Sequence, residues 1–155
     1  MSYRSVAILC VLAGFAQSAA ADRQKLVVVV ARGSAVTSVS RSELKHCFMG
    51  DTISPAGVPL VPFNAEPRTA QRGGFDRAVL GMSPDEVGRF WVDRKVRGQS
   101  AAPRSLPSIA HVQKVVAKFP NAIGYVPADQ LTAELQPVKV DGVAYTDSNY
   151  ALFTE

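Results

Sequence analysis

The apolar positions of the chain form runs and stripes that predict alternating strands and helices. Residues 26–30 (LVVVV) are continuously apolar and β-branched, which is typical of a strand covered on both faces. Further strands are predicted at 59–63, 122–126 and 135–140. Because helical stripes separate these strands, the pattern favours an α/β fold in which helices flank a mostly parallel sheet.

Helix-start signals lie between the predicted strands. A capping box at Ser40–Glu43 opens a short helix, and a second at 83–86, with proline in its first turn, opens a longer one. An intervening helix is expected around Phe75, but Gly73-Gly74 lies inside its pattern and glycine is a poor helix former. The two glycines either allow close backbone packing or precede the helix. A last helical stripe consists of Ile109, Val112, Val116 and Phe119.

The first residues have the pattern of an export signal. Arg4 precedes a short apolar stretch at 6–15, and the small residues at 18–21 suit the −3 and −1 positions that signal peptidase requires. The stretch is too short to span about 30 Å of hydrocarbon. Cys10 lies inside it and is not expected to carry a lipid. We therefore expect 1–21 to be a cleavable signal peptide.

Cleavage near Ala21 or Asp22 would leave a periplasmic domain, 22–155, of about 134 residues with no stable membrane anchor. The net charge would fall from +4 to +3, which does not indicate nucleic-acid or membrane binding. Cys47 would be the one remaining cysteine, so no intrachain disulfide is expected.

Five motifs in order resemble the second lobe of the phosphate-type periplasmic substrate-binding proteins of ABC transporters, the type II periplasmic binding protein fold. The motifs are SRSELKHCFMGD, PLVPFNAEPRTAQRGGFDRAVLGMS, RFWVDRKVRGQ, FPNAIGYVP and VKVDGVAYTDSNYAL. They extend over almost all of 25–154. The resemblance implies a single lobe of a fold that normally closes two lobes around its ligand. We expect this single lobe to be the native architecture, completed by a homodimer or by another envelope protein.

The resemblance also points to a ligand-binding turn at 66–72, where a loop enters a helix whose free amides favour an anion. On alignment Thr69 falls on the family's serine, Ala70 follows it, and Arg68 replaces a glycine. Ala65 stands where many phosphate binders keep an arginine. The candidate ligand-binding residues here are Arg68, Thr69, Ala70 and Arg72. Alternatively, Thr69 is only the helix cap and the arginines are solvated.

Ser34 is a secondary ligand-binding candidate, because it follows the end of a strand, where α/β folds collect ligands. Eight basic residues against four acidic ones lie between Arg68 and Arg104, an excess that either steers anions or belongs to ordinary solvated helices. No metal site is expected, since His46 and His111 are isolated.

The expected function is therefore binding of phosphate or a similar small oxyanion for an uptake system, with no cofactor. The alternative is a ligand-free interaction module for an envelope sensor, porin or transporter. An enzyme is not expected, because no catalytic motif can be assembled from the sequence.

Overall fold

The computed structural model describes residues 23–155, so the predicted signal peptide lies outside the described residues. The strands are β1 (Leu26–Ala31), β2 (Ser38–Val39), β3 (Val61–Asn64), β4 (Arg104–Ser105), β5 (Ala122–Pro127), β6 (Leu135–Pro137) and β7 (Lys139–Val140). The α-helices are α1 (Arg41–Phe48), α2 (Ala70–Phe75), α3 (Pro84–Val96) and α4 (Ile109–Lys118). A π-helical turn, Asp76–Leu80, extends α2, and short 3₁₀ turns lie at Pro55–Gly57 and Ala128–Gln130.

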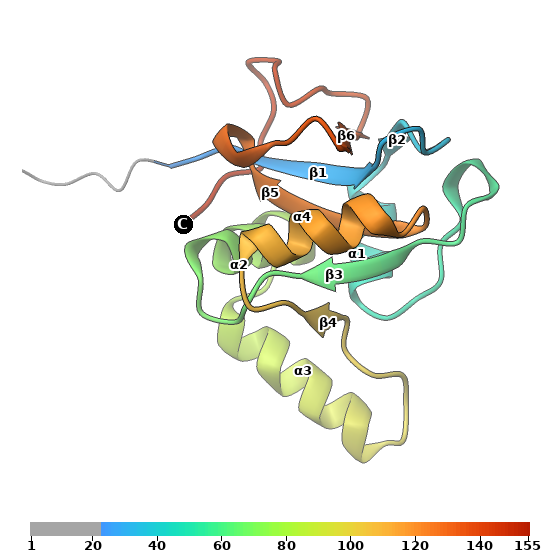
Figure 1. Cartoon of the computed structure of the whole chain (residues 1–155). Helices are drawn as coiled ribbons and strands as arrows, with labels where there is room; N and C mark the ends of the chain where they lie inside the picture. The colour runs from blue at the N-terminus through green and yellow to red at the C-terminus, as the bar shows by residue number, and fades with distance from the viewer. Residues whose placement is uncertain (1–22) are drawn as a thin grey trace, which may run out of the picture.

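Five strands form one mixed sheet in the order β4-β3-β5-β1-β6 (Figure 1). The β4–β3 and β3–β5 pairs are parallel, whereas β1 is antiparallel to both β5 and β6. Four strands therefore run one way and β1 runs against them. The predicted α/β class is confirmed. A mostly parallel sheet was expected: four of the five strands do run in the same direction, but two of the four strand pairings are antiparallel because β1 lies between β5 and β6.

The buried run of β1 separates two apolar cores. Val28 and Val30 join the core that holds Phe48 of α1 and Phe75 of α2, while Val27 and Val29 join the core under α4. All six residues of β1 are buried. Because successive side chains of a strand point to opposite faces, a strand with helices on both sides must be apolar throughout, and this prediction is confirmed.

The two predicted capping boxes are present at Ser40 and Ser83, which begin α1 and α3. The apolar residues Val87, Phe90, Trp91 and Val96 of α3 have helical spacing, but Val87 is the one buried residue of this helix. In Figure 1, α3 extends away from the sheet, and Val87 and Trp91 are its residues that belong to or pack against the core of α1 and α2. The predicted strand at 135–140 is divided into β6 and β7, which belong to different sheets.

Gly73 and Gly74 lie inside α2, which decides between the two alternatives for this pair. The end of the chain passes across the helix here: Thr154 pairs with Gln24 beside β1, and the Glu155 amide donates to the carbonyl of Ala70 at 3.2 Å. A Cβ atom on Gly74 would lie 2.7 Å from the Cα of Thr154. The glycine is therefore required for close backbone packing.

Replacing this glycine tests the packing. We expect Gly74→Ala to lower the free energy of unfolding by about 1–3 kcal/mol in urea titrations, since backbone and not a flexible side chain occupies the space. Gly88→Ala in α3 is the matched control, because a Cβ there meets nothing within 4 Å and alanine favours the helix. Equal effects of the two changes would contradict this description.

Candidate functional site

The turn between β3 and α2 lies at the edge of the sheet where β3, β4 and β5 end. These three strands are parallel, so their carboxyl ends share that edge. Tyr125 supports the base of the turn: its hydroxyl accepts from the Ala65 amide at 3.3 Å and donates to Asn64 Oδ1 at 3.2 Å. The Tyr125 ring stacks on Phe75 with centroids 3.9 Å apart. Strand end, turn and helix are thus fixed to one another.

Thr69 is the N-cap of α2. Its hydroxyl oxygen accepts from the Arg72 amide at 3.3 Å, and the hydroxyl donates to the Glu66 carbonyl at 2.8 Å. The side chain therefore holds the turn closed, as a capping threonine does, and its proton is already engaged. The cap role of Thr69 is observed, and a direct contact between Thr69 and an anion stays a prediction.

Two amides of the turn have no acceptor among the described residues. The Ala70 and Gln71 N–H groups occupy the first two helical positions, where intrahelical acceptors are missing. Arg68 precedes them, exposed and with φ of 69°. A left-handed backbone suits glycine better than any other residue, which accounts for the glycine that the resemblance places at this position.

Arg72 has a different environment from the one expected of a solvated arginine. It is buried, and its Nε donates to Asp76 Oδ2 at 2.7 Å, one helical turn further on. Its Nη1 reaches the Ala65 carbonyl and the Ser105 hydroxyl, each at 3.4 Å. Arg72 thereby joins the end of β3, the π-helical turn and the edge strand β4, and Asp76 neutralises much of its charge.

Asp76 was not identified from the sequence, although the four-residue spacing from Arg72 is a pairing signal. Burial raises the pKa of its carboxyl group, and the charge and hydrogen bond of Arg72 oppose that rise. Its second oxygen, Oδ1, is buried and accepts no hydrogen bond from the described residues. The carboxylate thus depends on Arg72 for its charge compensation.

Ser34 lies at the opposite edge of the sheet. Because β1 is antiparallel to β5, its carboxyl end stands beside the start of β5, with Val30 opposite Ile123. The Ser34 hydroxyl accepts from the Val36 amide at 3.3 Å, and its carbonyl accepts from Gln136. The structure therefore brings Arg68, Thr69, Ala70 and Arg72 together and leaves Ser34 apart. Whether any of these five residues contacts a ligand stays a prediction.

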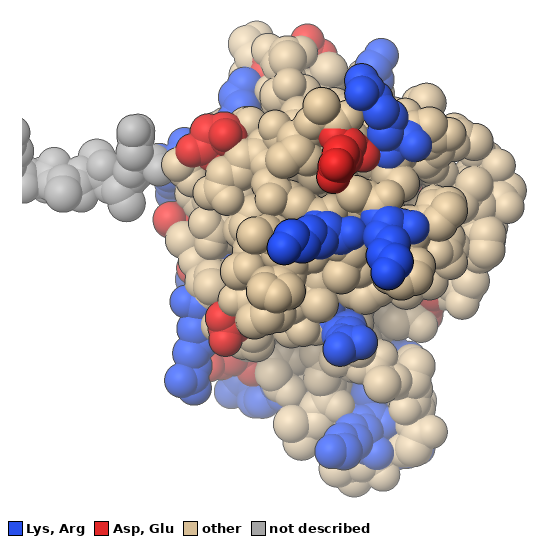
Figure 2. All heavy atoms as spheres, in the orientation of Figure 1, with Lys and Arg blue, Asp and Glu red and all other residues tan. Residues whose placement is uncertain are grey.

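The basic residues of the 68–104 segment do not form one uniform field. Figure 2 shows lysine and arginine side chains spread from α4 to α3 on the face in view. Arg72, Arg77 and Arg97 pair with Asp76, Glu155 and Asp93 respectively. Arg94 lies over the Phe90 and Trp91 rings. Pairing reduces the anion-steering potential that the sequence count suggested.

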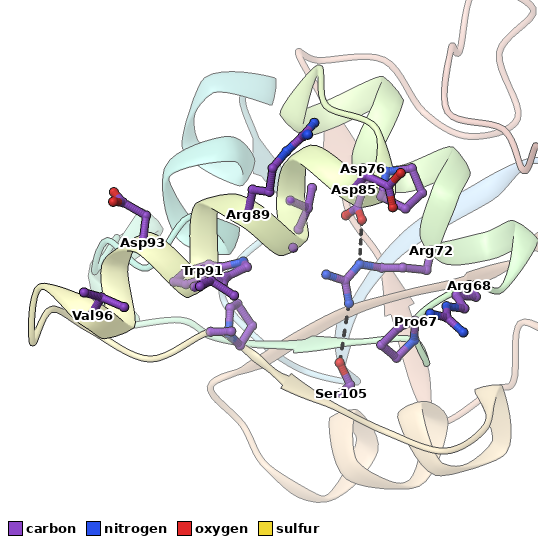
Figure 3. A pocket seen from close by; sticks show the side chains of 16 residues that line it. Pro67, Arg68, Arg72, Asp76, Asp85, Arg89, Trp91, Asp93, Val96 and Ser105 are labelled. Atoms are coloured by element: carbon purple, nitrogen blue, oxygen red, sulfur yellow. Dashed lines mark hydrogen bonds and ion pairs between the residues drawn. The ribbon is translucent and has the colours of Figure 1, made fainter.

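A groove opens beside the turn, between α3 on one side and β4 on the other (Figure 3). Its volume is about 920 Å³. Arg72 and Asp76 lie at its base, Arg68 lies at one end, and Trp91 forms part of the α3 wall. The groove is thus continuous with the turn that the sequence singled out.

The mixed sheet with its flanking helices matches one lobe of a periplasmic binding protein fold. No family model and no curated protein matches the sequence. Several solved structures, however, match the fold of the chain. A phosphate ABC transporter substrate-binding protein from Clostridium perfringens, with bound phosphate, aligns with a TM-score of 0.69 at 19% identity, over 85% of this chain and 53% of that one.

Two further structures agree. An ABC-type phosphate transport receptor from Vibrio cholerae aligns with a TM-score of 0.67 at 16% identity, over 85% of this chain and 54% of its own. PstS from Borrelia burgdorferi aligns with a TM-score of 0.63 at 12% identity, over 86% of this chain and 55% of its own. The chain therefore has the fold of part of these substrate-binding proteins and spans about half of their length.

The buried ion pair between Arg72 and Asp76 should make the free energy of unfolding depend on pH. In Arg72→Met the pKa of Asp76 should rise further, so the native state should bind a proton that the unfolded state releases. We expect a loss of about 3–5 kcal/mol near neutral pH. The loss should shrink as the pH falls toward the raised pKa, because stability then increases with protonation of the native carboxyl.

Chemical unfolding at several pH values measures this effect. The control is Arg72→Met combined with Asp76→Leu, which removes both charges and should regain most of the lost stability. A loss in Arg72→Met that stays constant from neutral to mildly acidic pH would mean that Asp76 is not the uncompensated group.

Proposed function

We propose that the protein binds a small oxyanion such as phosphate at the 68–71 turn, as part of a solute-uptake system outside the cytoplasm. The observation that carries the proposal is the pair of backbone N–H groups at Ala70 and Gln71, which have no acceptor among the described residues. Two adjacent amides at a helix start are donors of the kind that hold phosphate oxygens.

The helix behind these amides supports the same proposal. Helix α2 continues without a break into the π-helical turn that ends at Leu80. The aligned peptide dipoles therefore place partial positive charge at Ala70 and Gln71. The solved structure from Clostridium perfringens carries bound phosphate, which supports the proposal through the shared fold.

The residues of the turn take separate roles in this proposal. Arg68 is exposed and supplies the positive charge, and a charge-assisted hydrogen bond of this kind contributes roughly 1.5–3 kcal/mol when it is desolvated. Thr69 fixes the turn through its cap bonds. Arg72 does not contact the anion in this proposal but holds the start of α2 against β3 and β4.

A second wall belongs to the proposal. Arg68 and Ala70 are both exposed, so water competes with the protein for any anion at the turn. Excluding that water strengthens each electrostatic contact. We infer that a second copy of the chain, or another envelope protein, covers the turn when binding is tight.

Ala70→Pro tests the role of the amides. Proline lacks an N–H but suits the first helical position, and the extended backbone of Thr69, with ψ of 152°, accommodates a following proline. We expect at least tenfold weaker phosphate binding by calorimetry with unchanged or slightly higher stability. Ala70→Ser is the control and should bind as the wild type does. Full phosphate affinity in the proline variant would contradict the proposal.

Arg68→Gly separates charge from backbone strain. Glycine relieves the left-handed conformation, so the free energy of unfolding should rise by about 1 kcal/mol. Loss of the guanidinium should weaken phosphate binding by tenfold or more. Lys118→Gly, an exposed site on α4, controls for net charge. If Arg68→Gly binds phosphate as well as the wild type does, the arginine has no part in the site.

A further inference from the structure

The groove between α3 and β4 contains a hydrogen-bond donor that the proposed oxyanion site does not use. Arg72 donates to the described residues from Nε and Nη1, and its second terminal nitrogen, Nη2, donates to none of them. Among residues 23–155 the fully buried side-chain atoms without a partner are Asp76 Oδ1 and Arg94 Nε, so Nη2 keeps surface that a ligand can reach. In Figure 3 this nitrogen points into the groove toward Trp91. Because Arg72 is only 8% exposed, a buried side chain fixes the position of the donor.

Trp91 supplies an aromatic surface and a second donor in the same groove. Its ring packs edge-on against Phe90, with centroids 5.0 Å apart, and a Cβ atom on Gly50 would lie 3.2 Å from its Cη2 atom. The six-membered part of the indole is therefore held against the segment that follows α1. The indole Nε1 is not among the buried atoms that lack a partner in the described part of the chain, and the residue lines the groove. A tryptophan N–H at a partly buried site usually finds an acceptor, and a ligand in the groove can provide it.

The charges that line the groove leave a small positive excess. The Arg72–Asp76 ion pair is neutral as a unit, and Asp93 is engaged by Arg97, which lies outside the lining, at 3.0 Å. Two lining arginines have no carboxylate partner among the described residues, namely Arg68 and Arg89. Asp85 is the lining carboxylate that remains to oppose these two. An excess of one positive charge favours a ligand with a single negative charge.

Much of the remaining lining is apolar. Val92 and Val96 of α3 are 64% and 81% exposed, and both line the groove. Ala102 and Pro103, which precede β4, also belong to the lining. Exposed aliphatic side chains beside an indole ring favour an apolar group on the ligand. The volume of about 920 Å³ falls in the range of small-molecule sites and far exceeds the size of phosphate.

We propose that this groove binds a small monocarboxylic acid with an apolar body, such as an arylalkanoic acid. The two oxygens of its carboxylate accept from Arg72 Nη2 and Trp91 Nε1. Its apolar body packs on Val92 and Pro103. The two donors are side-chain groups and are separate from the backbone amides of the 68–71 turn, so this site does not depend on the oxyanion proposal.

Trp91 provides the measurement, because it is the one tryptophan in the sequence and gives a single indole N–H resonance in the ¹⁵N-labelled protein. We would titrate the purified protein separately with 3-phenylpropionate, 3-phenylpropionamide, acetate and phosphate. The indole resonance should shift saturably with 3-phenylpropionate, with a dissociation constant below about 1 mM. The amide lacks the negative charge and acetate lacks the apolar body, so each should bind at least tenfold more weakly. Phosphate should leave the indole resonance in place.

Variants locate the binding. Gly88 lines the groove and a Cβ atom there meets nothing within 4 Å, so Gly88→Leu should occupy the groove and abolish the saturable shift. Lys95→Leu is the matched control, because Lys95 is an exposed residue of α3 outside the lining, and it should bind as the wild type does. Arg72→Lys keeps the charge beside Asp76 but has no second terminal nitrogen, so it should bind 3-phenylpropionate at least tenfold more weakly.

Three results would overturn the proposal: no saturable indole shift with 3-phenylpropionate, equal affinity for the acid and its amide, or wild-type binding in Gly88→Leu. A phosphate-induced indole shift as large as that of 3-phenylpropionate would also overturn it, because the groove would then belong to the oxyanion site. Phosphate binding at the turn is followed in the same spectra through the Ala70 and Gln71 amides, so failure of either site is distinguishable from failure of the other.

Discussion

The ion pair between Arg72 and Asp76 is the interaction on which the functional edge of this lobe depends. One guanidinium joins the carbonyl that ends β3, a hydroxyl on the edge strand β4 and a carboxylate in the π-helical turn. Because both charges are buried, neither partner can be lost without leaving the other uncompensated.

Local signals predicted much of this fold. The capping boxes at Ser40 and Ser83 depend on residues three positions apart, and both helices begin where these residues stand. The burial of β1 also followed from its composition, since only a strand covered on both faces is apolar at every position. In both cases the signal itself lies within a few consecutive residues of the chain.

Features that depend on contacts between distant parts of the chain could not be predicted from the sequence. Ser34 seemed to lie at the ligand edge because it follows a strand, but periodicity does not record strand direction, and β1 runs against its neighbours. The hydrogen bond from Arg72 to Ser105 of β4 joins residues more than thirty positions apart, so the burial of this arginine could not be predicted from the sequence. The apolar positions of α3 follow helical spacing, yet Val96 is exposed and lines the groove.

Oxyanion binding at Ala70 and Gln71, the start of α2, is the proposal on which the function of this lobe depends. A phosphate titration of the ¹⁵N-labelled protein, followed by amide chemical shifts, tests it most directly. We expect the Ala70 and Gln71 resonances to move first and furthest and to saturate together, while amides near Ser34, at the opposite edge, stay in place. Saturable shifts centred elsewhere, or no shift at Ala70 and Gln71, would contradict it.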